Sequence, residues 1–237
     1  MLKEAMEYLV KMAAPQYVAV DGRAYCDRPL TVIAPPTLSM VPLLTLAGLV
    51  DLVKSNIDDL RAEMWLLHVG SFAEVTLMRK TTDEYGRRAV LARVKHDDGS
   101  PFPFGRFLDR EEFVIGLQSK FIQSESLRGV LAMASSLTAS TVAQADDDGV
   151  AQSVTVKRGI SLKEQVAVKG RVELAPFRTF REVEQPVSEF VFRLQSKDGS
   201  VPTCALFEAD GGKWKLDAVL TIKAWLEAQR LNIPVIA

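Results

Sequence analysis

Two acidic and two basic side chains near the end of the chain are close enough in sequence to do chemistry together. Glu208 and Asp210 precede Lys213 and Lys215 in the segment ALFEADGGKWKL. Metal-dependent nucleases use carboxylates to hold a divalent cation that activates water, often beside a lysine. The same residues also suit a β-hairpin with an Asp-Gly-Gly turn, in which Glu208 pairs with Lys213 or Lys215 across the strands. We therefore predict no catalytic residue here and keep the nuclease as an alternative.

An acidic run is a second candidate for metal chemistry. Asp146, Asp147 and Asp148 are consecutive and are followed by Gly149. Hard cations bind closely spaced carboxylates, but a Ca²⁺ loop needs acidic or amide residues at alternate positions and a closing glutamate. This run lacks that pattern. A solvated loop is the simpler interpretation, and we predict no metal site.

The histidines and cysteines form no recognisable catalytic or metal-binding motif. His68 and His96 are the only imidazoles, and neither belongs to an acid-base motif. We expect His68 to be half-buried in a strand and His96 to face water. Cys26 and Cys204 are far apart in sequence, which makes a zinc site improbable and favours free, buried thiols. No cofactor is predicted.

The segment LAPFRTFREVEQP alternates aromatic and arginine side chains. The residues that could contact a partner are Phe177, Arg178, Phe180 and Arg181. A groove for single-stranded nucleic acid uses aromatic rings for stacking and basic groups for phosphates. Aromatic residues and arginine are also enriched at protein interfaces. Glu182 and Glu184 could neutralise both arginines, so a strand end with paired charges is the alternative.

Composition limits the partners that the whole molecule can attract. The 237 residues are 48% hydrophobic and carry a net charge of −1, so a core can form, and general attraction to nucleic acid or anionic membranes is weak. No segment has the roughly 20 uninterrupted apolar residues of a membrane span. The N-terminus alternates charged and apolar residues, unlike a signal peptide. We expect no membrane partner and a cytoplasmic location.

The elements of the first half follow from periodicity and turn residues. Residues 2–13 predict an amphipathic helix that must dock, for example on a neighbouring subunit. Residues 17–33 predict a hairpin or an extended arm around an Asp-Gly turn, ended by Pro35 and Pro36. Thr45 is a candidate N-cap for a helix through Lys54. Beyond it, alternation in WLLHVGSFAEVTLMRK and RRAVLARVKH predicts a long β-hairpin.

In the second half, Asp109 can cap a helix that begins REEFVIGLQSKFI and either continues into LRGVLAMASSL or is followed by it as a separate helix. Antiparallel strands are predicted in SVTVKRG, QVAVKGRVELAPF, FVFRL, TCALFEA and WKLDAV, with a covering helix in LTIKAWLEAQRL. The fold class is α+β: an N-terminal arm and helix, a long β-hairpin, a central helix, and a C-terminal antiparallel sheet backed by a helix. We divide the chain into regions 1–36, 37–140 and 141–237 of one integrated domain.

Several segments carry a family resemblance. LAPFRTFREVEQPVSEFVFRLQ and CALFEADGGKWKLDA resemble signature blocks of the YfdQ-like family of uncharacterised phage and prophage proteins, and TLAGLVDLV, FPFGRFLDREEFVIGLQSKF and DDDGVAQSVTV are also similar. The resemblance covers most of the chain beyond about Pro35. It implies a phage or prophage origin, expression in the host cell cytoplasm, and a setting among early or recombination genes. It implies no activity and no catalytic residue.

Three functions remain open. The leading hypothesis is a non-enzymatic phage accessory protein that forms a homo-oligomer and binds host or phage proteins, in recombination or counter-defence. A second is a self-assembling shell protein like a phage capsid or encapsulin, because the element order is similar. In that case the tip of the hairpin that runs from Phe72 to Val94 is an oligomer clasp made of Thr81, Thr82, Asp83, Glu84, Tyr85 and Gly86. The third is a DNA-binding protein or a metal-dependent DNA-processing enzyme.

Overall fold

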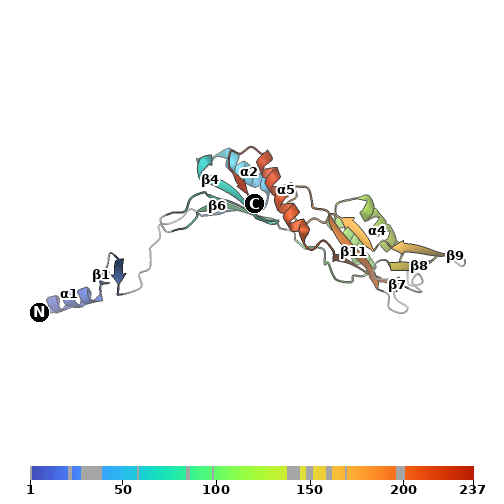
Figure 1. Ribbon diagram of the computed structural model, residues 1–237, viewed down its shortest axis with the longest axis horizontal. Coiled ribbons are helices and arrows are strands. Elements are labelled where there is room, and N and C mark those ends of the chain that lie inside the picture. The colour runs from blue at the N-terminus through green and yellow to red at the C-terminus, as the bar shows by residue number, and fades with distance from the viewer. Residues whose placement is uncertain are drawn as a thin grey trace. The chain divides into compact units, whose positions relative to one another are not determined.

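The chain forms two compact units, Met1–Thr37 and Leu38–Ala237. The computed structural model in Figure 1 describes residues 2–20, 23–27, 39–57, 59–83, 86–97, 99–137, 145–147, 152–158, 162–168, 170–195 and 201–237. Helices and mixed sheets give the predicted α+β fold class, with an antiparallel sheet and a helix toward the C-terminus.

The first unit contains the predicted helix and the predicted strand pair. Helix α1 spans Leu2–Ala13 and buries no residue. Strands β1 (Tyr17–Val20) and β2 (Arg23–Cys26) pair antiparallel, with Tyr17 opposite Cys26. The rest of the predicted arm, including Pro35 and Pro36, lies outside the described residues.

The second unit begins with a five-stranded mixed sheet in the order β13-β4-β5-β6-β3. Its strands are β3 (Val41–Leu43), β4 (Trp65–Ser71), β5 (Glu74–Arg79), β6 (Val90–Lys95) and β13 (Val235–Ile236). The pairs β4-β5 and β5-β6 are antiparallel, whereas β3 and β13 run parallel to their neighbours. The segment predicted as one strand over 65–80 is therefore two strands, because the chain turns at Phe72 and Ala73.

Two helices and a short turn pack with this sheet. Helix α2 spans Leu46–Ser55, and its predicted N-cap Thr45 accepts a hydrogen bond from the Gly48 N–H at 3.0 Å. Helix α5 spans Lys213–Ala228, and a 3₁₀ turn, η1, spans Ala62–Met64. Figure 1 places α2 and α5 beside β4 and β6. The core between them includes Leu46, Leu49, Leu67, Leu77, Ile222 and Leu226.

A second sheet lies in the same unit and is antiparallel in the order β10-β11-β12. Its strands are β10 (Arg171–Leu174), β11 (Ser188–Gln195) and β12 (Thr203–Glu208). Helices α3 (Arg110–Lys120) and α4 (Glu125–Ser136) pack on it, and Phe113, Phe121, Phe190 and Phe192 share their core. The two helices are separate, because Phe121 leaves the helix and bridges to Pro176. The predicted cap Asp109 accepts from the Glu112 N–H at 2.8 Å.

Three assignments need correction. The run QVAVKGRVELAPF, predicted as one strand, is divided between β9 (Leu162–Val168) and β10, which belong to different sheets. The run WKLDAV, predicted as a strand, begins α5, because its buried residues recur at helical spacing as Trp214, Ala218, Ile222 and Leu226. That helix packs on β4 and β13, while α3 and α4 cover the antiparallel sheet. The acidic run also differs from the predicted loop, since Asp146 and Asp147 belong to strand β7 (Ala145–Asp147).

Strands β7 (Ala145–Asp147), β8 (Gln152–Arg158) and β9 (Leu162–Val168) form a further antiparallel sheet. Asp148 and Gly149 lie outside the described residues. At the tip of the β5-β6 hairpin, Asp83 pairs with Arg87 at 2.7 Å, while Glu84 and Tyr85 are outside the description. Throughout the described segments, no helix has the length and apolar character needed to cross a membrane.

Candidate anion-binding pocket at Arg178

The connection between β10 and β11 carries a buried arginine and is held by one glutamine. The Gln185 side-chain oxygen accepts hydrogen bonds from the backbone N–H groups of Arg178 and Thr179, at 2.9 and 3.2 Å. Its amide donates to the Phe180 carbonyl at 2.9 Å. All four residues are buried. A buried polar side chain with its bonds satisfied specifies one loop conformation, so the position of Arg178 is well determined.

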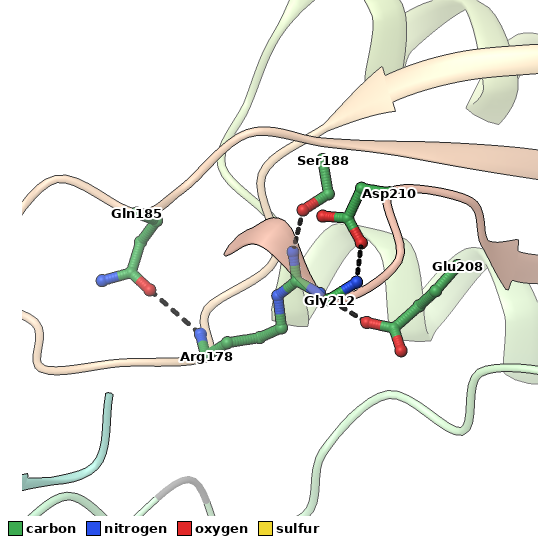
Figure 2. A network of polar contacts seen from close by, with 6 residues as sticks. All are labelled: Arg178, Gln185, Ser188, Glu208, Asp210 and Gly212. Carbon is green, nitrogen blue, oxygen red and sulfur yellow. Dashed lines mark hydrogen bonds and ion pairs between the residues drawn. The ribbon is translucent and has the colours of Figure 1, made fainter. Parts of the chain in front are cut away.

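The guanidinium of Arg178 is packed from several sides although it is charged. Nη1 donates to Glu208 Oε1 at 2.6 Å, and Nη2 donates to Ser188 Oγ (Figure 2). Its central carbon lies 4.0 Å from the centre of the Trp214 ring, in a cation-π arrangement. Burial lowers the pKa of Arg178 to about 10, against the opposing effects of Glu208 and Asp210. The side chain therefore stays cationic at neutral pH.

Asp210 connects this network to the start of α5. Its carboxylate accepts from the Gly212 N–H at 2.9 Å, as Figure 2 shows, and also from the Trp214 N–H and the Ser188 hydroxyl. Burial acts to raise the pKa of Asp210, but these hydrogen bonds and the Arg178 charge together lower it below its ordinary value. Asp210 is thus an anion that holds the first turn of the helix.

A pocket of about 320 Å³ lies beside this network. That volume is at the lower end of the range of about 300–1,000 Å³ for small-molecule sites. Four cationic side chains and one acidic side chain line it: Lys120, Arg178, Arg181, Lys215 and Glu208. Since Glu208 pairs with Arg178, the other three cations give the pocket a net positive charge.

The aromatic part of the lining comes from distant segments of the chain. The rings are those of Phe72, Phe102, Phe104, Phe177 and Trp214. They derive from the β4-β5 turn, the segment before α3, the β10-β11 connection and the first turn of α5. A pocket that joins aromatic surface to cations can hold a ligand with a flat apolar group and a negative charge.

Several of these groups are available for a ligand. Arg181 is exposed and lies 3.8 Å from the centre of the Phe177 ring. Arg181 and Lys215 have no ion pair within the described residues, and the Lys120 ammonium donates to the Pro101 carbonyl at 3.2 Å. Two buried donors of residues that line the pocket, Arg178 Nε and Trp214 Nε1, have no hydrogen-bond partner in the described structure. Buried donors normally have an acceptor.

The predicted interaction residues divide into two groups. Phe177, Arg178 and Arg181 line the pocket, whereas Phe180 is a core residue with 1% of its surface exposed. Arg178 is buried instead of lying on an open groove. Glu182 does not neutralise it, because the Glu182 carboxylate accepts from the Ala47 N–H of α2 at 3.1 Å.

The predicted interaction residues do not include Lys120, Phe72 or Trp214, and Lys215 is predicted only beside Glu208, in a hairpin or a nuclease site. Lys120 ends α3, and Lys215 was assigned to a strand instead of a helix. Phe72 and Trp214 are more than 140 positions apart in the printed sequence and lie with ring centres 4.7 Å apart. No local pattern relates such positions, although the apolar spacing of α5 could have placed Trp214 on a helix.

The nuclease constellation does not assemble. Glu208 pairs with Arg178, and Lys213 pairs with Asp217 at 3.6 Å instead of pairing across strands with Glu208. Among the residues whose placement is described, no three His, Cys, Asp or Glu side chains gather closely enough to hold a metal ion.

The remaining candidate side chains are separate from the pocket. Cys204 is a buried free thiol, and burial raises its pKa to about 12. Cys26 is free and half-buried. His68 is half-buried in β4 as predicted. His96 does not simply face water, because its half-buried ring lies 5.6 Å from that of Phe180.

Comparison with known proteins identifies no relative: no family model, no curated protein and no solved structure matches this chain significantly.

Proposed function

We propose that the protein acts by binding, and that the pocket at Arg178 is its site for an anionic partner. The observation that supports this best is the composition of the pocket, which has aromatic walls and three cations outside the Arg178–Glu208 pair. An anion there would satisfy unpaired charge in a partly desolvated site, where electrostatic interactions are stronger than in water.

The test is equilibrium binding to two chemically different polyanions at low salt. Fluorescently labelled oligothymidylate and labelled polyglutamate are titrated with the protein, and anisotropy is measured. We expect saturable binding to at least one of them. We further expect the double variant Lys120→Glu/Lys215→Glu to weaken it by at least 10-fold, because both ammonium groups line the pocket.

Lys213→Glu is the matched control. Lys213 lies two positions before Lys215 on the same exposed turn but does not line the pocket. The affinity of Lys213→Glu for the polyanion should stay close to that of the wild type. Absence of binding to both polyanions would contradict the proposal, as would an equal loss in the control. Circular dichroism of each variant checks that it is folded.

Self-association is a second candidate function, favoured by α1. Leu2, Met6, Leu9 and Val10 lie on one side of this helix and are 61–80% exposed. An isolated helix of 12 residues is marginally stable in water, so an apolar partner for this face would stabilise it. Light scattering should then give a mass above that of one chain for the wild type and a smaller mass for Met6→Glu/Leu9→Glu. An unchanged mass would oppose this role of α1.

The biological setting that we propose follows from the resemblance to YfdQ-like proteins: a phage or prophage accessory protein in the host cell cytoplasm. A closed shell is the alternative form of self-association. It predicts large particles in electron micrographs of the light-scattering peak, and their loss when residues 81–86 are deleted. A monomer or small oligomer would remove the shell but leave a binding protein.

A further inference from the structure

We propose that the anionic partner is single-stranded nucleic acid, and that two successive nucleotides lie on either side of the Phe177–Arg181 stack. This inference rests on the proposed function, since it names the partner of the same pocket. It also adds a second hollow to the site.

The Phe177–Arg181 stack separates two hollows. Both side chains line the pocket at Arg178, and both also line a second pocket of about 400 Å³. The guanidinium of Arg181 lies 3.8 Å from the centre of the Phe177 ring, so the two groups form one layered ridge. Ridges of aromatic and arginine side chains are surfaces on which unpaired bases stack.

The two hollows differ in charge, and this difference determines which of them receives a phosphate and which receives a base. The first has the cations Lys120 and Lys215, and the second has none besides Arg181. The other side chains that line the second hollow are apolar, uncharged polar or acidic, and they include Ile122, Val187, Ser124, Glu173 and Glu184. Carboxylates repel a phosphate but accept hydrogen bonds from amino groups on bases. The phosphate is therefore expected in the first hollow and a base in the second.

Single-stranded nucleic acid fits this arrangement better than an acidic peptide. A strand alternates flat aromatic groups with negative charges at a regular repeat, and it needs stacking surface as well as cations. The site offers both within one short segment, since Phe177 and Arg181 are four positions apart. An acidic peptide would use the cations but would gain little from the stacked ridge.

The experiment compares labelled oligodeoxycytidylates of one, two and eight nucleotides, whose bases carry an amino group, with an abasic strand of eight phosphates and with polyglutamate. Binding is measured by anisotropy at two salt concentrations. We expect the dinucleotide to bind at least 10-fold more tightly than the mononucleotide, and the eight-nucleotide strand to bind at least 10-fold more tightly than the abasic strand. Phe177→Ala should remove most of the difference in affinity between the eight-nucleotide strand and the abasic strand, because it removes the ring on which a base stacks.

Phe107→Ala is the control, since Phe107 is 41% exposed but lines neither hollow. Equal affinity for the abasic strand would overturn the nucleic-acid inference while leaving an anion pocket intact. Tighter binding of polyglutamate would overturn it in favour of an acidic protein partner. If no polyanion binds, the proposed function fails together with this inference. If Phe107→Ala lost as much affinity for the eight-nucleotide strand as Phe177→Ala, the Phe177–Arg181 stack would not be the site where bases bind.

Discussion

At the scale of single residues, Arg178 determines both the structure and the chemistry of the candidate site. Its side chain is 8% exposed, yet it is charged and joins β11, β12 and α5 through Ser188, Glu208 and Trp214. Burying a cation is costly unless partners compensate for lost hydration. The Arg178 guanidinium already pairs with the Glu208 carboxylate, and it lines a pocket where a second anion can approach it.

We predict that Arg178→Ala destabilises the protein by about 3 kcal/mol, because the truncation removes packing on Trp214 and the hydrogen bond to the buried Ser188 hydroxyl. Arg178→Met should lose less stability than Arg178→Ala, since the methionine side chain can pack where the aliphatic part of the arginine side chain does. Urea denaturation followed by circular dichroism measures both. A loss smaller than about 0.5 kcal/mol in Arg178→Ala, typical of surface sites, would contradict this account of the network.

Asp210 gives a prediction about pH. Its pKa is lower in the folded protein than the ordinary value of 3.8, so its contribution to stability is complete above that value and disappears as the pH falls through the lower, folded value. Asp210→Ala should cost about 1 kcal/mol at pH 7, as lost helix caps do, and less below pH 3.8. Denaturation at pH 7 and at pH 3 tests this. A cost that grows on acidification would reverse the sign and refute the assignment.

At the scale of elements, helix α5 illustrates why part of the fold was predictable and part was not. The N-caps of α2 and α3 could be predicted from the local sequence, since Thr45 and Asp109 begin these helices as expected. WKLDAV was misassigned because its aromatic and β-branched residues suit a strand, while its buried residues recur every four positions. The Gly211-Gly212 pair before it also suits the turn of a hairpin. In the fold, Asp210 and tertiary packing make it a helix start.

Two glycine substitutions, one at the start of α5 and one inside α4, should have opposite effects on stability. Gly212 has φ of +82° at the N-cap of α5, so we predict that Gly212→Ala destabilises the protein by about 1 kcal/mol through backbone strain. Gly129, inside α4, has open space around an added Cβ and no positive φ. Gly129→Ala should stabilise the protein by about 0.5–1 kcal/mol. Thermal or urea unfolding of the two variants measures the change in stability of each. Equal changes in Gly212→Ala and Gly129→Ala would contradict the prediction.

At the scale of the whole molecule, the pocket is a product of tertiary structure within the second unit. Its cations and rings come from the β4-β5 turn, the segment before α3, α3 itself, the β10-β11 connection and α5. The segment 177–181, in which rings and arginines alternate, contributes one wall of the pocket. The other walls could not be predicted, because only packing brings Phe72, Lys120 and Trp214 to the same place.

The most direct test of the account is to map where an anionic strand contacts the protein. An oligonucleotide that carries a single photoreactive 5-iodouracil is bound to the full chain and irradiated, and the linked peptide is identified by mass spectrometry. We expect cross-links to the rings that line the pocket, first of all Phe177 and then Phe72. Specific cross-links confined to other surfaces, such as the first unit, would contradict a binding site at Arg178.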